Sequence, residues 1–312
     1  MKKILDLVGL ANAVTDCIIT VTDAELHYVG FKKGAFNRKR HIDLNSFLDF
    51  IEEKEKVLVP GGSPANTIRG ASNLGLHCGL FGSLGTDLVG KHYIKNLNSI
   101  GVDNCFDITS GRSGICYALI TPDGERSMMV DMGQAETYGF DISQMNFTKI
   151  FHTSGYELLS RPDKVMAAIE YAKSVGAKIS FDLAAENVVE VEKKNIDHLI
   201  NNYIDILFVT EEEAEALVGV EPEKAVQELS KLCEITLFKK GKKGSVVLNK
   251  GLSFEIPIYP VKVVNTTGAG DSYAAGFLFG YVQGIHLEAC GHLGSQIASK
   301  ACGQEMPYYL GN

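Results

Sequence analysis

The residues best suited to chemistry lie in the segment VVNTTGAGDSYAAGFLFG, residues 263–280. An apolar stretch that predicts a strand ends at two threonines, and Gly268-Ala269-Gly270 then leads into Asp271 and a helical pattern. Free backbone N–H groups at a helix start bind anions, and Asp271 would lie where it can accept a proton. The alternative is a plain strand-to-helix turn, with Asp271 favoured by the helix dipole.

A second glycine-rich segment, PGGSPANTIRGASNLG, occupies residues 60–75. Gly61 and Gly62 remove side chains where a backbone could approach a ligand, and a helix is expected to begin directly after them. Asn66 falls in its first turn, where the amide can donate to and accept from hydroxyl groups. A tight turn that leads into a helix, with Asn66 in solvent, explains the segment equally well.

Two carboxylates follow other predicted strands. Asp16 comes soon after the first strand, and its two oxygens suit vicinal sugar hydroxyls, although a turn residue is the simpler interpretation. Thr210 and Glu213 have the spacing of a capping box, which explains both residues structurally. Glu213 could in addition organise a hydrated Mg²⁺, because Mg²⁺ usually keeps several waters and few protein carboxylates.

The segment LFKKGKKGS, residues 237–245, ends another predicted strand in a basic turn bounded by Gly241 and Gly244. An ordinary loop is one interpretation. A nucleotide phosphate bound near these glycines is the other, with positive charge supplied by Lys239, Lys240, Lys242 and Lys243.

The composition excludes several classes of protein. The formal net charge of -8 argues against a nucleic-acid partner, since phosphate backbones require basic surfaces. No apolar run reaches transmembrane length, so we expect no membrane span. The seven cysteines are scattered singly and no signal peptide is evident, which favours a reduced, cytoplasmic protein. The histidines show no zinc-binding spacing.

Short apolar runs alternate with helical patterns along most of the chain, which predicts a parallel sheet flanked by helices. In residues 163–177, for example, Val165, Ala168, Ile169 and Ala172 recur at helical spacing. Residues 14–21 and 113–130 break the pattern and predict hairpins in a small β-sheet over one end. We therefore predict a single domain, 1–312, with lid strands within 13–40 and 112–131.

Together these segments resemble the ribokinase-like (PfkB) carbohydrate kinases. Residues 60–75 and 263–280 are similar to the two signatures of that family, and their order along the chain fits. SGICYALITPDGERSMMVDMGQA and IDILFVTEEEAEALVG are similar to segments of the adenosine-kinase-type branch. The resemblance implies a three-layer α/β/α fold with a mostly parallel sheet and a small β-sheet lid. It also implies ATP-dependent phosphorylation of a hydroxymethyl group, with an alcohol group as acceptor.

The resemblance also implies roles for particular residues. Asp271 would be the general base, and the backbone N–H groups of Gly268, Ala269 and Gly270 would form an anion hole. The acceptor would bind to Asn12, Asp16, Gly61, Gly62 and Asn66, and ATP to Lys239, Gly241, Gly244 and Ser295. Glu213 would help to hold Mg²⁺ through water. The chain departs from the family pattern at two positions. Asn265 stands where Asp is usual, which affects a nearby cation or loop contact, and Thr210 stands where Asn is usual, which affects the contacts between the metal and its waters.

The acceptor expected from this resemblance is an adenosine-like nucleoside, and the alternative is a free sugar such as ribose or fructose. A catalytically silent protein that binds a sugar or nucleotide on the same scaffold is a second alternative. A nicotinamide-dependent dehydrogenase is excluded, because no GxGxxG follows a predicted strand. Dependence on a monovalent cation stays open, as does a homodimer formed through an exposed lid edge.

Overall fold

The computed structural model describes residues 5–35, 37, 39–139, 141, 148–304, 306 and 308–311. Within them, nine strands form one sheet in the order β13-β12-β11-β10-β9-β8-β1-β4-β5. All neighbours from β5 to β11 are parallel, and β12 and β13 add an antiparallel edge. The strands are β1 (Leu5–Leu10), β4 (Cys78–Gly85), β5 (Asp103–Thr109), β8 (Thr148–Ser154), β9 (Lys178–Asp182), β10 (Ile206–Thr210), β11 (Ile235–Lys239), β12 (Ser245–Asn249) and β13 (Leu252–Ile256).

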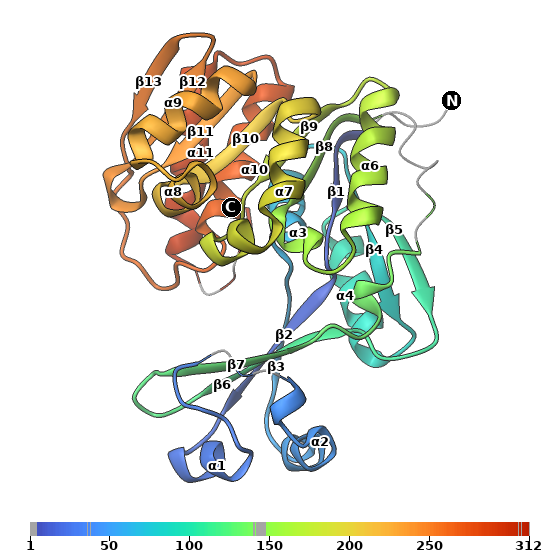
Figure 1. Cartoon of the computed structure of the whole chain (residues 1–312). Helices are drawn as coiled ribbons and strands as arrows, with labels where there is room; N and C mark the ends of the chain where they lie inside the picture. The colour runs from blue at the N-terminus through green and yellow to red at the C-terminus, as the bar shows by residue number, and fades with distance from the viewer. Residues whose placement is uncertain are drawn as a thin grey trace.

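Helices cover both faces of this sheet (Figure 1). One hydrophobic core joins the sheet to α6 (Pro162–Ser174), α7 (Glu186–Asn202), α8 (Glu211–Val218) and α9 (Pro222–Leu232). The core on the opposite face includes α3 (Ser63–Asn73), α4 (Leu88–Ser99), α10 (Ala269–Val282) and α11 (Leu287–Cys302). This arrangement confirms the three-layer α/β/α fold with a mostly parallel sheet.

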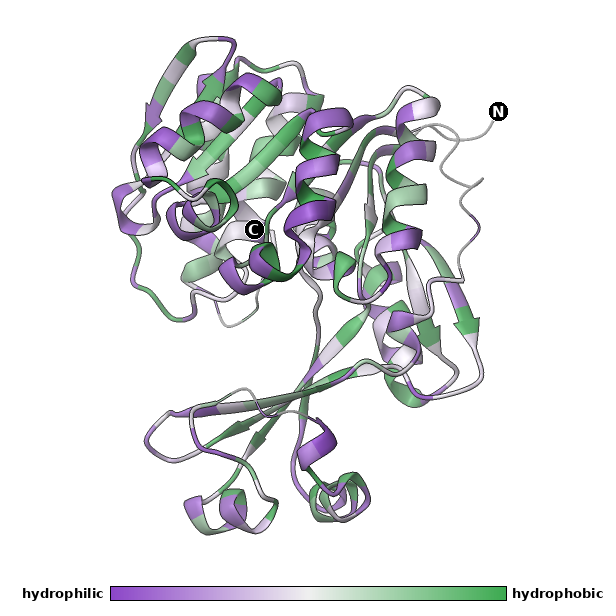
Figure 2. Ribbon diagram, viewed as in Figure 1, coloured by the Kyte–Doolittle hydropathy of each residue, from purple (hydrophilic) through white to green (hydrophobic). Residues whose placement is uncertain are grey.

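The local patterns explain why these segments adopt their elements. The four apolar residues that predict a helix in residues 163–177 are all buried in α6. The segment 78–85 forms β4, and every one of its residues is buried, as is usual for a central parallel strand. Figure 2 shows hydrophobic residues along the central strands and hydrophilic residues on the outer faces of the helices.

The small residues of α10 allow close packing against α11. A Cβ atom at Gly276 would lie 2.8 Å from the Leu293 carbonyl oxygen, and one at Gly280 would lie 3.0 Å from Cys290 Sγ. Glycine at these two positions therefore lets α10 and α11 pack closely. In the described part of the chain, no helix has the length and apolar character needed to cross a membrane.

A second sheet projects from the main body (Figure 1) and has the strand order β3-β2-β6-β7. Its strands are β2 (Val14–Thr20), β3 (Val57–Pro60), β6 (Gly114–Ile120) and β7 (Arg126–Asp131). The sheet contains β3, which lies outside both ranges in which the sequence places lid strands. Residues 23–28 of the first range form helix α1 (Asp23–Tyr28) rather than a strand.

The two faces of this small sheet differ. On one face Cys17, Ile19 and Tyr117 pack against α1 and α2 (Leu44–Glu52). Phe47 of α2 meets the Tyr117 ring edge-on, with 4.9 Å between centroids. Because side chains alternate along a strand, Asp16 lies on the opposite face with its partner Cys116. The helices therefore leave the face that carries Asp16 uncovered.

Candidate active site

Asp271 lies in the first turn of α10, where two helix starts meet. The turn before α10 passes through Gly268, whose φ of 73° is in the left-handed region that favours glycine. Asn265 stabilises this turn, since its Oδ1 accepts from the Thr267 N–H at 2.9 Å. The backbone of 268–270 is partly exposed, which leaves it open to a ligand. Of the three N–H groups expected in the anion hole, that of Ala269 donates to the Thr266 carbonyl at 3.2 Å.

The start of α3 supplies the hydrogen bonds to Asp271. Ser63 Oγ donates to Oδ1 at 2.7 Å, and Asn66 Nδ2 donates to Oδ2 at 3.0 Å. Burial raises the pKa of Asp271 to about 6, while the two hydrogen bonds oppose that shift. The structure thus brings together the two glycine segments that the sequence singles out.

Gly61 and Gly62 bring the backbone of the first segment against the turn that follows β1. Gly62 has a φ of 94°, and a Cβ atom there would lie 2.4 Å from the Asn12 carbonyl oxygen. A Cβ atom at Gly61 would lie 3.5 Å from Asp16 Oδ2, so Asp16 extends over this segment. Burial raises the pKa of Asp16, although the charge of Arg126 and a hydrogen bond with Cys116 lower it.

Asn12 is near the site, but its side chain is bonded to the protein. Its Nδ2 donates to the Tyr156 carbonyl at 3.2 Å, and its Oδ1 accepts from the Tyr138 hydroxyl group. Its backbone N–H donates to the buried Glu157 at 3.1 Å. Asn12 therefore supports the turn that follows β1.

Arg69 is a residue of this region that the sequence analysis missed. Its side chain is fully buried in α3, and Nη1 lies 3.4 Å from both the Gly61 carbonyl oxygen and Asn66 Oδ1. The guanidinium group lies over the rings of Tyr93 and Tyr308, 4.7 and 5.4 Å from their centroids. In the sequence Arg69 is an ordinary basic residue of a helix, and nothing local shows that aromatic rings enclose it.

The strand ends beside α10 contribute an ion pair. Lys239 Nζ, at the end of β11, lies 2.7 Å from Asp182 Oδ2, at the end of β9. A Cβ atom at Gly270 would lie 3.5 Å from this ammonium group, so Lys239 faces the start of α10. Lys239 is expected at ATP because it precedes the turn at Gly241. Asp182 ends a predicted strand just as Lys239 does, but it was not among the expected site residues.

Glu213 and Thr210 form the capping box that their spacing predicts. Glu213 Oε2 accepts from the Thr210 N–H at 2.8 Å, and Thr210 Oγ1 accepts from the Glu213 N–H at 3.3 Å. Burial raises the pKa of Glu213 to about 7, with Lys239 lowering it and Asp182 raising it further. Across the described residues, no three His, Cys, Asp or Glu side chains are grouped to bind a metal ion. A lone Glu213 suits a Mg²⁺ ion held mainly by water and phosphate oxygens.

The remaining residues expected at ATP lie in the turn after β11 and in α11. Gly241 and Gly244 bound a turn after β11 with φ values of 53° and 93°, and a Cβ atom at Gly244 would lie 2.2 Å from the Ile256 carbonyl oxygen. Ser295 is buried in α11, where its Oγ donates to the Pro257 carbonyl at 2.7 Å. Ser295 therefore anchors the segment that leads from β13 to α10.

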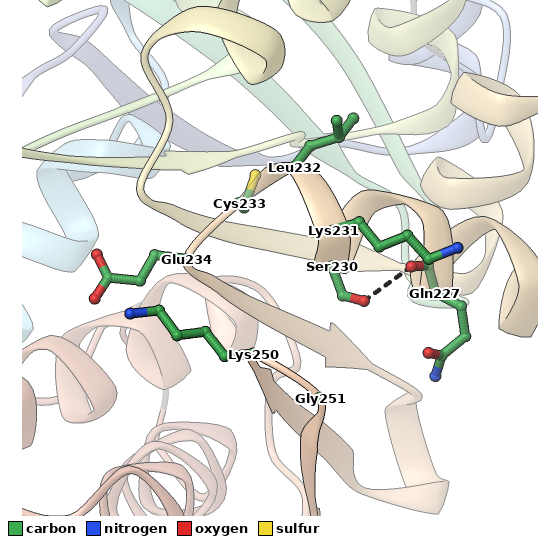
Figure 3. Close-up of a pocket in the computed structure, with 8 residues that line it drawn as sticks. All are labelled: Gln227, Ser230, Lys231, Leu232, Cys233, Glu234, Lys250 and Gly251. Carbon is green, nitrogen blue, oxygen red and sulfur yellow. Dashed lines mark hydrogen bonds between the residues drawn. The ribbon is translucent and has the colours of Figure 1, made fainter.

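A separate hollow lies at the opposite end of the sheet (Figure 3). Glu234 immediately precedes β11, whereas Lys239 ends it, so the hollow and the site around Asp271 lie at opposite ends of this strand. Glu234 is paired with Lys178 at 2.5 Å. The hollow has no part in the site around Asp271.

Known proteins are similar to this chain in both sequence and fold. Residues 37–309 match the family described as "pfkB family carbohydrate kinase". The chain is 31% identical to the probable fructokinase-5 of Arabidopsis thaliana over 277 residues, 83% of this chain and 85% of the relative. It is 27% identical to the adenosine kinase of Saccharomyces cerevisiae over 286 residues, 84% of this chain and 83% of the relative.

Solved structures give the same result. The adenosine kinase from Sinorhizobium meliloti superposes with a TM-score of 0.86 at 28% identity, covering 99% of this chain and 97% of that protein. A probable sugar kinase from Rhizobium etli CFN 42 also gives 0.86, at 26% identity, covering 98% and 95%. These matches confirm the resemblance found in the two glycine segments. The chain belongs to the pfkB family of carbohydrate kinases and is a kinase of sugars or nucleosides.

Proposed function

We propose that the chain transfers the γ-phosphoryl group of ATP to the hydroxymethyl group of an adenosine-like nucleoside. The observation that carries the nucleoside assignment is the position of Tyr156, in the short helix α5 (Gly155–Leu158) after β8. Tyr156 is 41% exposed, and its pKa is raised by partial burial and by the nearby negative charges of Asp271 and Asp182. An exposed aromatic ring beside the proposed base offers a flat apolar surface on which a purine can stack.

Asp271 would act as the general base in this transfer. The acceptor hydroxyl oxygen would form a bond to the γ-phosphorus as the bond from that phosphorus to the β,γ-bridging oxygen breaks. The hydroxyl proton would pass to Asp271, and ADP would leave. The partial positive charge at the start of α10, where the N–H groups of Gly268 and Gly270 lie, would stabilise the transferred group.

The other residues would hold the two substrates. Asp16 would accept hydrogen bonds from the ribose hydroxyl groups, with Gly61 and Gly62 allowing the sugar to approach the backbone. The turn between Gly241 and Gly244 would line the ATP site. Mg²⁺, held through water by Glu213, would neutralise charge on the phosphates.

The small sheet would act as a lid within a single kinase domain. Its uncovered face carries Asp16, so closure would place that carboxylate over the acceptor and exclude water from the reacting phosphate. Because α1 and α2 cover the other face, a homodimer formed through the lid would pair an edge strand, β3 or β7, or use the uncovered face.

ADP release from MgATP, measured with adenosine, inosine, ribose and fructose, tests the assignment. We expect kcat/KM for a nucleoside to exceed that for either free sugar by at least about tenfold, since each 1.4 kcal/mol of added contact gives tenfold. Tyr156→Ala should raise KM for the nucleoside and leave KM for ribose within about threefold. Higher kcat/KM with fructose than with any nucleoside would instead support the sugar-kinase alternative, which the relationship to a probable fructokinase favours.

A further inference from the structure

We infer that Asp182 positions Lys239 so that its ammonium group binds the phosphates of the nucleoside triphosphate during transfer. This inference rests on the proposed phosphoryl transfer at the start of α10. It makes Lys239 a catalytic residue and Asp182 a positioning residue that acts through it.

The sheet places both residues on the edge where the substrates meet. Asp182 ends β9 and Lys239 ends β11, with β10 between them, and ligands of parallel sheets bind at the carboxyl ends of strands. Lys239 crosses the end of β10 to reach Asp182, with 2.7 Å between Nζ and Oδ2. The two side chains are only 15% and 7% exposed, so solvent screens the pair weakly.

The ammonium group shares its surroundings with the start of α10. Lys239 Nζ would lie 3.5 Å from a Cβ atom at Gly270, so the ammonium group faces the backbone of Gly270 at the helix start. Backbone N–H groups and a lysine that converge on one space form a phosphate site. An ammonium group has three donors, so the bond to Asp182 leaves two for phosphate oxygens.

The carboxylates around Lys239 keep its ammonium group charged, as phosphate binding requires. Lys239 interacts with Asp182, Glu213 and Asp271, three carboxylates against one ammonium group. His152 lies near the pair as well, but burial lowers its pKa to about 4, so it is neutral at physiological pH. A buried ion pair commonly adds little net stability over apolar residues of similar size. The position of the Lys239 ammonium group against Gly270 is explained if this group compensates the negative charge of a bound phosphate.

Lys239→Met tests the catalytic role, because it keeps most of the length of the side chain and removes the charge. We expect kcat to fall at least about 100-fold, as for the loss of a donor to a developing charge. KM for the acceptor should change less than about threefold. In calorimetry, affinity for ATP should fall more than affinity for ADP, since the γ-phosphate is present only in ATP.

Lys178→Met is the matched control. Lys178 is also ion-paired, with Asp205 at 3.1 Å and Glu234 at 2.5 Å, but it is more exposed than Lys239 and lies at the opposite end of the sheet. This variant should lose stability and keep kcat. If Lys239→Met lowers kcat no more than Lys178→Met does, the inference is wrong, while ADP release by both variants would leave the kinase assignment intact.

Asp182→Asn tests the positioning role. We expect kcat to fall about tenfold, and the double variant Asp182→Asn/Lys239→Met to be no slower than Lys239→Met alone, because Asp182 acts through Lys239. The double variant also leaves no unpaired charge from this pair, so it serves in place of Lys239→Met if that variant does not fold. Additive losses of kcat in the double variant would overturn the positioning role. If the wild-type chain releases no ADP with any acceptor, the proposed kinase function is wrong. If Lys239→Met loses affinity for ATP and for ADP equally, the inference about Lys239 is wrong, whatever the outcome for the proposed function.

Discussion

The side-chain amide of Asn66 donates to Oδ2 of Asp271 over 3.0 Å, across 205 positions of sequence. Arg69 fixes the orientation of that amide, because its Nη1 donates to Asn66 Oδ1 at 3.4 Å. The first glycine segment therefore holds the carboxylate of the second in place. The proposed base is oriented before any substrate binds.

Asn66→Leu should weaken catalysis most at low pH. Loss of the hydrogen bond removes an interaction that lowers the pKa of Asp271, so that pKa should rise by about one unit, the equivalent of one hydrogen bond. The profile of kcat against pH should move to higher pH by a similar amount. A fall in kcat of equal size at pH 6 and pH 8 would mean that Asn66 does not act through Asp271.

In the wild-type chain, kcat should rise with pH through about 6. Burial raises the pKa of Asp271 to about 6, and a general base must be deprotonated to act, so activity is lost as the pH falls below that value. Measurements of kcat between pH 4.5 and 8 at saturating substrates check this. A profile that stays flat down to pH 5 would contradict it.

Asp271→Asn should stabilise the folded chain at pH 8. The folded pKa of about 6 lies above the unfolded value of 3.8, so the fold favours the protonated carboxyl group. The free energy of unfolding therefore decreases as the pH rises through this interval, and the wild type loses about 3 kcal/mol that the variant keeps. Chemical denaturation at pH 8 and pH 4 should show a difference between the two proteins only at pH 8. If the variant is no more stable than the wild type at pH 8, burial does not destabilise the ionised carboxylate of Asp271.

Gly62→Ala should destabilise the chain by about 2–4 kcal/mol, through both its left-handed backbone and steric overlap. Its new Cβ atom would lie 2.4 Å from the Asn12 carbonyl oxygen. Gly75→Ala is the control, since its φ is also positive at 104° but no atom lies within 4 Å of the new Cβ. That variant should lose only about 1 kcal/mol. Equal losses in urea denaturation would show that the contact with Asn12 does not matter.

The glycine segments could be found from sequence because their chemistry is local. Residues 268–271 are consecutive, and a helix start can bind an anion without help from distant residues. The strand predicted just before it is wrong, because the exposed residues Val263 and Val264 pair with no neighbouring strand that the structure describes. The capping box of Thr210 and Glu213 is local for the same reason.

The residues that were missed depend on contacts between distant segments. The pair of Asp182 and Lys239 exists only because β9 and β11 lie two strands apart in the sheet. Arg69 is enclosed partly by Tyr308, near the other end of the chain. The strand β3 is only four residues long, and α1 and α2 separate it in sequence from its partner β2. Its short apolar run therefore does not indicate which sheet it joins.

The central claim is that Asp271 accepts the proton of the acceptor hydroxyl group. The most direct test is acceptor-dependent ADP release by the wild type and by Asp271→Ala, with acceptor binding measured by calorimetry on the same samples. We predict that kcat falls by at least about 1000-fold in the variant, while the dissociation constant of the acceptor changes less than about tenfold. A variant that keeps kcat near the wild-type value would contradict the account.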